Sequence, residues 1–245
     1  MRAIVCGACG RMGRVLRQMI NEALDWTLAA GVDPYGQTPD VLPSLEGCPE
    51  ADVIIDFSHH SGTNALLAYA VERKLPVVIA TTGHTPEELA AIAEAAKKIP
   101  VFRSGNMSVG VALLCSLAKK AANVFPEADI EIVETHHNHK LDAPSGTALM
   151  LAEAIGEARD NPPLQLGRSG NCPRQKGEIG IHAVRRGEIV GIHEVLISTP
   201  TQTVTLRHEA HTRALFAEGA MAAAEYLCAQ GPGLYNMQSM IDQEN

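Results

Sequence analysis

The chain has 245 residues, of which 46% are hydrophobic, so it is long enough for one large domain or two modest ones with a sizeable core. Its formal net charge of -8 repels phosphate backbones and anionic membrane surfaces, which excludes bulk binding to either. No apolar run approaches the roughly 20 residues that span a bilayer, and the N-terminus has no charged-then-apolar leader. We therefore expect a cytoplasmic protein with no nucleic-acid or membrane partner.

The six cysteines are scattered along a chain too large to need disulfides, and we interpret them as reduced thiols. Cys6 and Cys9 form a CxxC pair, but both lie in a glycine-rich turn with no second pair to complete a zinc site. We therefore expect no metal there.

Short apolar runs alternate with helical stretches through the first half of the chain. The predicted strands are residues 3–7, 27–33, 51–58, 76–83 and 101–106, and the predicted helices are residues 11–24, 64–73 and 86–98. Such apolar runs, without polar alternation, are typical of a parallel sheet covered on both faces. We predict an α/β fold with a Rossmann-like, doubly wound parallel sheet.

The pattern changes from Ala128 onward. Residues 128–137, 179–199 and 201–210 are strand-like with few helices between them, which predicts a second, α+β domain on a mixed or antiparallel sheet. Residues 215–230 then form a long helix, and we expect the tail after it to end without a strand.

Three glycines, Gly7, Gly10 and Gly13, stand between the first predicted strand and the first predicted helix. A strand that enters a helix through glycines lets the backbone approach a pyrophosphate, and the N–H groups of the helix start attract that anion. Asp33 closes the second strand, where a carboxylate can accept from ribose hydroxyls and repel a 2′-phosphate. We expect a nicotinamide dinucleotide here, with NADH used at least as well as NADPH. The alternative is a tight turn that binds nothing.

Residues 136–140 read HHNHK and have three interpretations. As a zinc site, only His137 and His139 would share a strand face, and no closing pair accompanies them. They could also be ordinary solvated or core histidines. As an acid/base site for an anionic substrate, histidine titrates near neutrality and lysine can hold a carboxylate.

The residues after this cluster favour the acid/base interpretation. Ser145 can cap a helix that opens with Gly146, Thr147 and Ala148, and the first N–H groups of such a helix bind anions. Two anion-binding devices close together indicate a substrate with two carboxylates. With a nicotinamide cofactor, the chemistry would be hydride transfer with proton donation.

Residues 134–148 contain the pattern E-x-HHxxKxDAPSGTA, and G-A-x-GRMG, TTG, N-x-SVGV and G-x-IVG-x-H appear elsewhere in the chain. With these motifs, the chain resembles the 4-hydroxy-tetrahydrodipicolinate reductase (dihydrodipicolinate reductase) family over nearly its whole length. The family belongs to lysine (diaminopimelate) biosynthesis. It reduces the cyclic product of pyruvate and aspartate semialdehyde with hydride from NAD(P)H and loss of water.

The resemblance also implies roles for residues and domains. His136 would be the general acid/base and Lys140 a second proton donor, while His137, Gly146 and Thr147 would bind the carboxylates of the ring substrate. The cofactor would be lined by Gly7, Ala8, Cys9, Gly10, Arg11, Met12, Asp33, Ala80, Thr81, Thr82, Ser104, Gly105, Asn106 and Met107. Residues 1–108 with 214–245 would form the dinucleotide-binding domain, and residues 109–213 a substrate-binding domain that builds a homotetramer.

Some positions depart from the family pattern. Cys9 stands where small residues are usual, and Ala80 stands where the family has a glycine. Ile192 stands where the family often has glutamate, and Glu209 where it has lysine. No role is transferred to Ile192 or Glu209.

Two rival functions stay open: another NAD(P)-dependent reductase of a small dicarboxylate or amino acid, and a non-catalytic dinucleotide-sensing protein. The sensor would need a partner-binding segment, and the only candidate is the basic stretch of residues 168–186.

Overall fold

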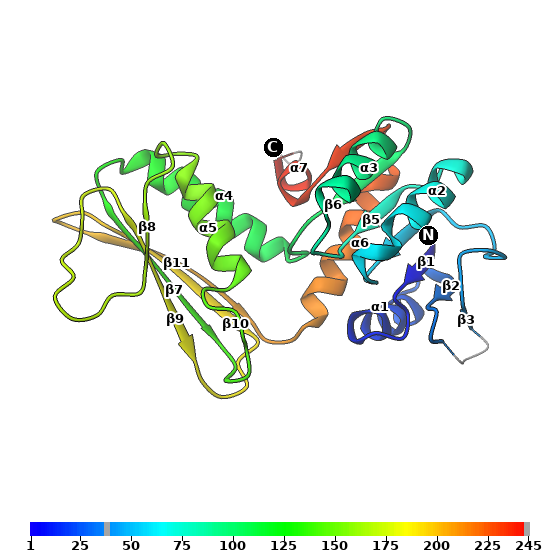
Figure 1. The fold of residues 1–245 in the computed structure, drawn as a ribbon, viewed down its shortest axis with the longest axis horizontal. Coiled ribbons are helices and arrows are strands. Elements are labelled where there is room, and N and C mark those ends of the chain that lie inside the picture. Colours follow the sequence, from blue (N-terminus) through cyan, green and yellow to red (C-terminus); the bar gives the residue numbers. More distant parts are fainter. Residues whose placement is uncertain (37–39, 243–245) are drawn as a thin grey trace. The chain divides into compact units, whose positions relative to one another are not determined.

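The computed structural model describes residues 1–36 and 40–242, and the chain folds as two compact units (Figure 1). Unit 1 is Met1–Ser108 with Ala214–Asn245, and unit 2 is Val109–Arg213. Residues 37–39, in the loop after the second predicted strand, and residues 243–245, in the predicted tail, lie outside the described residues.

Unit 1 is built on a seven-stranded sheet in the order β12-β6-β5-β4-β1-β2-β3, and all its pairings are parallel. Its strands are β1 (Arg2–Cys6), β2 (Thr27–Val32), β3 (Val41–Leu42), β4 (Val53–Asp56), β5 (Val77–Ile79), β6 (Pro100–Arg103) and β12 (Gly233–Tyr235). The strand order reverses beside β1, so the carboxyl ends of β1 and β4 border the crevice where doubly wound folds bind ligands.

Helices cover both faces of this sheet. Leu66 and Ile92 bring α2 and α3 onto one face, and α1 and α6 pack against each other and against strands of the sheet. The helices of unit 1 are α1 (Arg11–Glu22), α2 (Thr63–Arg73), α3 (Pro86–Ala96), α6 (Ala214–Cys228) and α7 (Met237–Asp242), with a 3-10 turn η1 (His60–Gly62) before α2. Because both faces are buried, the strands read as uninterrupted apolar runs.

Small residues let α6 pack close to unit 1's strands and loops. Ala217, Ala220 and Ala224 are buried along the helix. A Cβ added at Gly219 would lie 1.7 Å from the carbonyl oxygen of Met107, in the loop after β6. The C-terminal helix therefore belongs structurally to unit 1, although unit 2 separates it from β6 in the sequence.

Unit 2 contains a five-stranded sheet in the order β11-β10-β7-β9-β8, parallel among β7, β9 and β8 and antiparallel where β10 joins β7 and β11. Its strands are β7 (Asp129–His136), β8 (Leu164–Leu166), β9 (Ile179–Arg185), β10 (Gly191–Ser198) and β11 (Thr203–Ala210), and its helices are α4 (Val109–Val124) and α5 (Gly146–Gly156). Figure 1 shows both helices on one side of this sheet. Ile130 and Ile132 of β7 face them in the core, and Glu134 and His136 continue that face because strand residues alternate.

The predicted fold class is confirmed: a Rossmann-like doubly wound parallel sheet with a second α+β domain on a mixed sheet. The prediction that the tail ends without a strand is wrong, because β12 adds an edge strand parallel to β6. The 16-residue α4 was not predicted. The strand-like segment at residues 179–199 is two strands, β9 and β10, joined by a turn with Gly187 at φ +51°. No helix within the described ranges is long and apolar enough to cross a membrane.

Candidate functional site

The glycine turn of unit 1 depends on glycine at two positions. Gly7 has φ +74°, and a Cβ there would lie 2.5 Å from the carbonyl oxygen of Phe57. Gly13 is buried in the first turn of α1, where a Cβ would lie 2.1 Å from the carbonyl oxygen of Gly7. The turn is therefore folded against its own helix, with Gly10 as an N-cap that supplies no side-chain hydrogen bond.

Asp33 follows β2 and is nearly buried, with 8% of its surface exposed. One carboxylate oxygen accepts from the N–H of Cys9 at 3.0 Å, and the other accepts from the N–H of Tyr35 at 3.0 Å. The sequence thus placed Asp33 correctly at the strand end. The carboxylate also holds the glycine turn in position beside β2.

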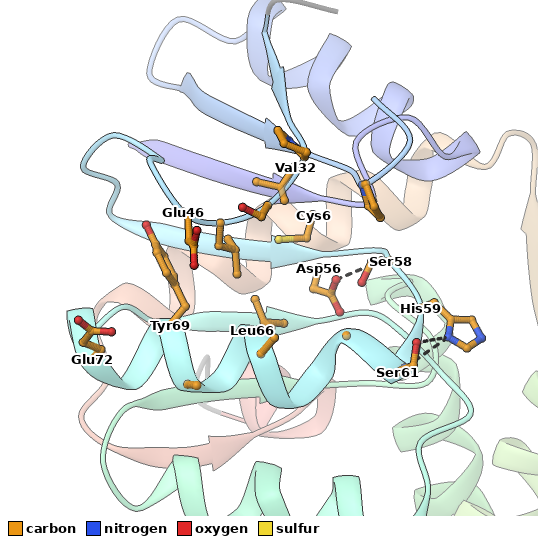
Figure 2. A pocket seen from close by; sticks show the side chains of 18 residues that line it. Cys6, Val32, Glu46, Asp56, Ser58, His59, Ser61, Leu66, Tyr69 and Glu72 are labelled. Atoms are coloured by element: carbon orange, nitrogen blue, oxygen red, sulfur yellow. Dashed lines mark hydrogen bonds between the residues drawn. The ribbon is translucent and has the colours of Figure 1, made fainter. Parts of the chain in front are cut away.

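A cavity of about 560 Å³ opens between the ends of β1, β2 and β4, the loop after β3 and one face of α2 (Figure 2). Cys6, Val32, Leu66 and Tyr69 give it an apolar wall, and Asp56, Ser58, His59 and Ser61 stand at one end. Among the predicted cofactor residues, only Gly7 belongs to its lining. The sequence analysis missed the loop after β4 and the face of α2. The carboxyl ends of parallel strands lie at one edge of a sheet, so the end of the predicted strand at residues 51–58 could have indicated that loop.

The other predicted cofactor residues end β5 and β6 of the same sheet. The Thr81 hydroxyl donates to a carboxylate oxygen of Asp56 at 2.7 Å, which ties β5 to β4, and burial raises the pKa of Asp56. Ser104 donates to the carbonyl oxygen of Asn106 at 2.6 Å. These short loops are held by internal hydrogen bonds, next to the carboxyl edge of the sheet.

These features fit a dinucleotide. The turn is closed against Phe57 and its own helix, the α1 start offers N–H groups for a pyrophosphate, and a carboxylate stands at the end of β2. The cavity beside them is large enough for a purine with its ribose and is mainly apolar, as ligand pockets are.

In unit 2, His136 ends β7 and is buried, with 7% of its surface exposed. Its Nδ1 lies 2.6 Å from a carboxylate oxygen of Glu134, and its ring meets His193 edge-on with 5.1 Å between centroids. Burial lowers the pKa of His136 below its ordinary value, while Glu134 raises it in opposition. Burial lowers the pKa of His193 to about 3, so that ring is neutral.

The start of α5 lies beside this histidine, as the sequence predicted. The Ser145 hydroxyl caps the helix by accepting from the N–H of Ala148 at 3.2 Å, and it lies 3.1 Å from Nε2 of His193. Gly146 and Thr147 form the first turn, and a Cβ at Gly146 would meet no atom within 4 Å. The helix start is therefore open on that side and close to His136.

The rest of the HHNHK segment forms a turn after β7. The ring of His137 lies against that of His139, with 5.3 Å between centroids, and His139 contacts Glu188 on the neighbouring turn. The ammonium of Lys140 lies 2.8 Å from a carboxylate oxygen of Asp142, which lowers the pKa of Asp142. Within the part of the chain that the structure describes, no group of three or more His, Cys, Asp or Glu residues could hold a metal ion.

The basic stretch of residues 168–186 is largely neutralised by acidic side chains. Arg168 pairs with Glu178, and Arg174 pairs with Glu131 and Asp129 on β7. Further pairs include Lys176 with Glu127 and Arg185 with Glu134. Three of its arginines, Arg168, Arg174 and Arg185, are largely buried in these ion pairs. This removes the only candidate partner-binding segment of a dinucleotide sensor.

The two departures from the family pattern in unit 2 are cross-strand partners. Ile192 of β10 lies opposite Glu209 of β11, and Ile192 is buried while Glu209 binds Arg207.

Comparison with known proteins identifies the family to which the chain belongs. Residues 1–107 match the family model "Dihydrodipicolinate reductase, N-terminus", and residues 110–241 match "Dihydrodipicolinate reductase, C-terminus". The chain is 47% identical to the 4-hydroxy-tetrahydrodipicolinate reductase of Caldanaerobacter subterraneus subsp. tengcongensis over 98% of both chains.

Solved structures agree. A dihydrodipicolinate reductase from Paenisporosarcina sp. TG-14, with dipicolinate bound, is 26% identical, has a TM-score of 0.82 and covers 96% of this chain and 97% of its own. The aspartate dehydrogenase of Thermotoga maritima, at 12% identity, a TM-score of 0.52 and coverage of 93% and 96%, shares the fold alone.

The glycine turn, the parallel sheet and these matches define a pyridine-nucleotide-dependent reductase. The chain belongs to the 4-hydroxy-tetrahydrodipicolinate reductase family, whose members are oxidoreductases of lysine biosynthesis.

Proposed function

We propose that the chain carries out this reduction with unit 1 as its dinucleotide-binding domain and unit 2 as its substrate-binding domain. When bound, NADH or NADPH supplies the hydride. The N–H groups at the start of α1 and the residues from Gly7 to Met12 would hold the pyrophosphate. Asp33 would accept from the ribose hydroxyls, and the ends of β5 and β6, residues 80–82 and 104–107, would border the nicotinamide.

In unit 2, His136 would deliver the proton that completes the reduction, from its Nε2. Lys140 would donate to the substrate as a second cationic group, and His137 with the α5 start at Gly146 and Thr147 would bind carboxylates. A ring dicarboxylate fits this arrangement, and dipicolinate in the Paenisporosarcina enzyme is such a ligand. The observation that carries the proposal is the buried His136 beside the open N-terminus of α5.

Replacing Lys140 with Ala tests this assignment. A charge-assisted hydrogen bond to an anion contributes about 1.5–3 kcal/mol, so kcat/KM should fall by about 10- to 100-fold while NADH binding stays unchanged. The measurement is NADH oxidation with substrate generated from pyruvate and aspartate semialdehyde. The control is Asp142→Asn, which removes the partner of Lys140 and leaves the ammonium in place. Equal activity of Lys140→Ala and wild type would contradict the role of Lys140.

We further propose that NADH is used at least as well as NADPH, because the nearly buried carboxylate of Asp33 repels a 2′-phosphate. Asp33→Asn should improve kcat/KM for NADPH relative to NADH by about tenfold, which corresponds to about 1.4 kcal/mol. Steady-state kinetics with both nucleotides measures this ratio. The control is Asp52→Asn. Asp52 precedes β4, at the amino ends of the strands, and is paired with Arg2. A ratio that stays constant in Asp33→Asn would assign the preference to other residues.

We also propose a homotetramer that assembles through the sheet of unit 2. The sheet face that holds Val133, Val184 and Leu196 is turned away from α4 and α5, and these side chains stay partly exposed. A partly apolar sheet face of this kind is suited to burial against another copy of the chain.

The free state of all six cysteines supports the proposal that the enzyme works in the cytoplasm.

A further inference from the structure

Glu134 is a buried carboxylate with four hydrogen bonds. None of its surface is exposed. Arg185 donates to both of its oxygens, at 2.8 Å each, and the backbone N–H of Ser145 donates to one of them at 3.0 Å. His136 Nδ1 lies 2.6 Å from the other oxygen. The carboxylate therefore joins three parts of unit 2: β7, which carries His136, β9, and the turn before α5.

Sheet register explains why these groups meet. Glu134 and His136 are two residues apart on β7, so both point to the face that α4 and α5 cover. On β9, Arg185 lies directly beside His136 and reaches diagonally to Glu134. On β10, His193 lies opposite Glu134. A slip of one residue in either pairing would take these side chains to the other face.

We propose that Glu134 and Arg185 are positioning residues, which hold His136 with its Nδ1–H on the carboxylate and its Nε2 directed toward the substrate. The same carboxylate, through the N–H of Ser145, fixes the start of α5 relative to that ring. One buried ion pair thereby sets both the proton donor and the helix start that binds the substrate's carboxylate. This inference rests on the proposed role of His136.

The chemistry of the four groups supports this arrangement. An ionised carboxylate only accepts hydrogen bonds, so the His136 nitrogen beside it carries a proton. Burial pushes the pKa of Glu134 upward, but hydrogen bonds from Arg185, His136 and Ser145 outweigh it and hold that pKa below its ordinary value. Glu134 is therefore ionised. When His136 acts as an acid, the proton leaves Nε2 and Nδ1 keeps its own.

Gly191 leaves space at the reacting nitrogen. A Cβ added at Gly191 would lie 3.1 Å from Nε2 of His136, closer than an ordinary packing contact. The backbone at the start of β10 thus passes close beside Nε2. This agrees with an orientation in which Nδ1 is bound and Nε2 is the working atom.

The experiment compares wild type with Glu134→Gln and with the double variant Glu134→Gln/Arg185→Met, which leaves no unpaired charge in the site. In both variants we expect unchanged NADH affinity, KM within about threefold, and kcat lowered by about 10- to 100-fold, the range typical when an orienting partner of a functional histidine is lost. Glu188→Gln removes another carboxylate that contacts a histidine, His139, on the exposed turn, and should keep wild-type kcat.

Two further readouts separate positioning from a structural role. The first is the pH profile of kcat: Glu134 raises the pKa of His136, while Lys140 and Arg185 lower it and His193 is neutral beside it. Loss of the Glu134 charge should therefore move the alkaline limb to lower pH. The second is ¹⁵N NMR of labelled histidine, assigned with His136→Gln, in which Nδ1 of His136 should lose its fixed proton.

The outcomes are distinct. A double variant that folds and recovers wild-type kcat, with an unchanged His136 spectrum, would overturn the positioning inference while leaving the role of His136 intact. Wild-type kcat in His136→Gln itself would instead overturn the proposed function of His136, and the positioning inference with it. If Glu134→Gln alone does not fold, the double variant decides between these outcomes.

Discussion

Replacing His136 with Gln is expected to lower kcat by about 10²- to 10⁴-fold, the usual contribution of a general acid or base. Glutamine fills the same space and can still bind Glu134, but it has no group that releases a proton near neutral pH. Binding of NADH should stay at the wild-type level, because His136 belongs to unit 2 and the dinucleotide features belong to unit 1. The measurement is kcat and KM for the substrate, with NADH titration by fluorescence in parallel.

The role of His136 as an acid also predicts how the activity of the wild type depends on pH. The protonated form of His136 acts as the acid, so wild-type activity should fall as pH rises through its pKa. Burial has lowered that pKa, so the fall should begin on the acid side of histidine's ordinary range. His139→Gln is the matched control, since His139 lies in the same turn but is largely exposed and contacts only Glu188 and His137 in the described contacts. A rate unchanged in His136→Gln would contradict the acid role.

Gly13→Ala is expected to raise the Kd for NADH by roughly 100-fold or more. The new Cβ would lie 2.1 Å from the carbonyl oxygen of Gly7 and 2.9 Å from Cα of Ala8. Both contacts are backbone atoms, so the turn itself has to move, and a shift of about 1 Å in a positioning element can cost about 100-fold in function. Isothermal titration with NADH measures the loss.

Overpacking at this position should also lower the free energy of unfolding, by about 1–3 kcal/mol, which urea unfolding measures separately. Gly231→Ala is the control in the same unit, because a Cβ there meets no atom within 4 Å. Wild-type NADH affinity in Gly13→Ala, with an intact fold, would show that the turn does not bind the pyrophosphate.

Most strands and helices of unit 1 could be predicted from the sequence, whereas α4 of unit 2 and β12 of unit 1 could not. α1 was predicted because Leu16 and Ile20 recur at helical spacing beside charged residues. α4 is apolar around most of its surface, so no helical stripe marks it. β12 has three residues next to glycine and proline, a composition that local patterns assign to a loop, and only pairing with β6 makes it a strand.

The same division holds for the site. His136, Lys140 and the helix start at Ser145 are neighbours in the sequence, so their motif identified them together. Arg185 reaches Glu134 from β9 and His193 meets His136 from β10, and their place depends on strand register, which the sequence alone did not give. The clash that makes Gly13 essential to the turn is likewise visible only once α1 is folded back on Gly7.

The order in which the chain is synthesised bears on how its parts acquire their cores. Unit 2 is one continuous segment, whereas unit 1 needs α6 against β4, β5 and β6, and β12 beside β6. A nascent chain that has emerged only as far as Arg213 therefore carries every strand of unit 2. At that stage the parallel sheet of unit 1 still has an unpaired edge at β6, and the apolar face that α6 will cover is exposed. The first half of unit 1 is made early but must wait for the last residues, so its apolar surface stays uncovered longer than that of the segment synthesised after it.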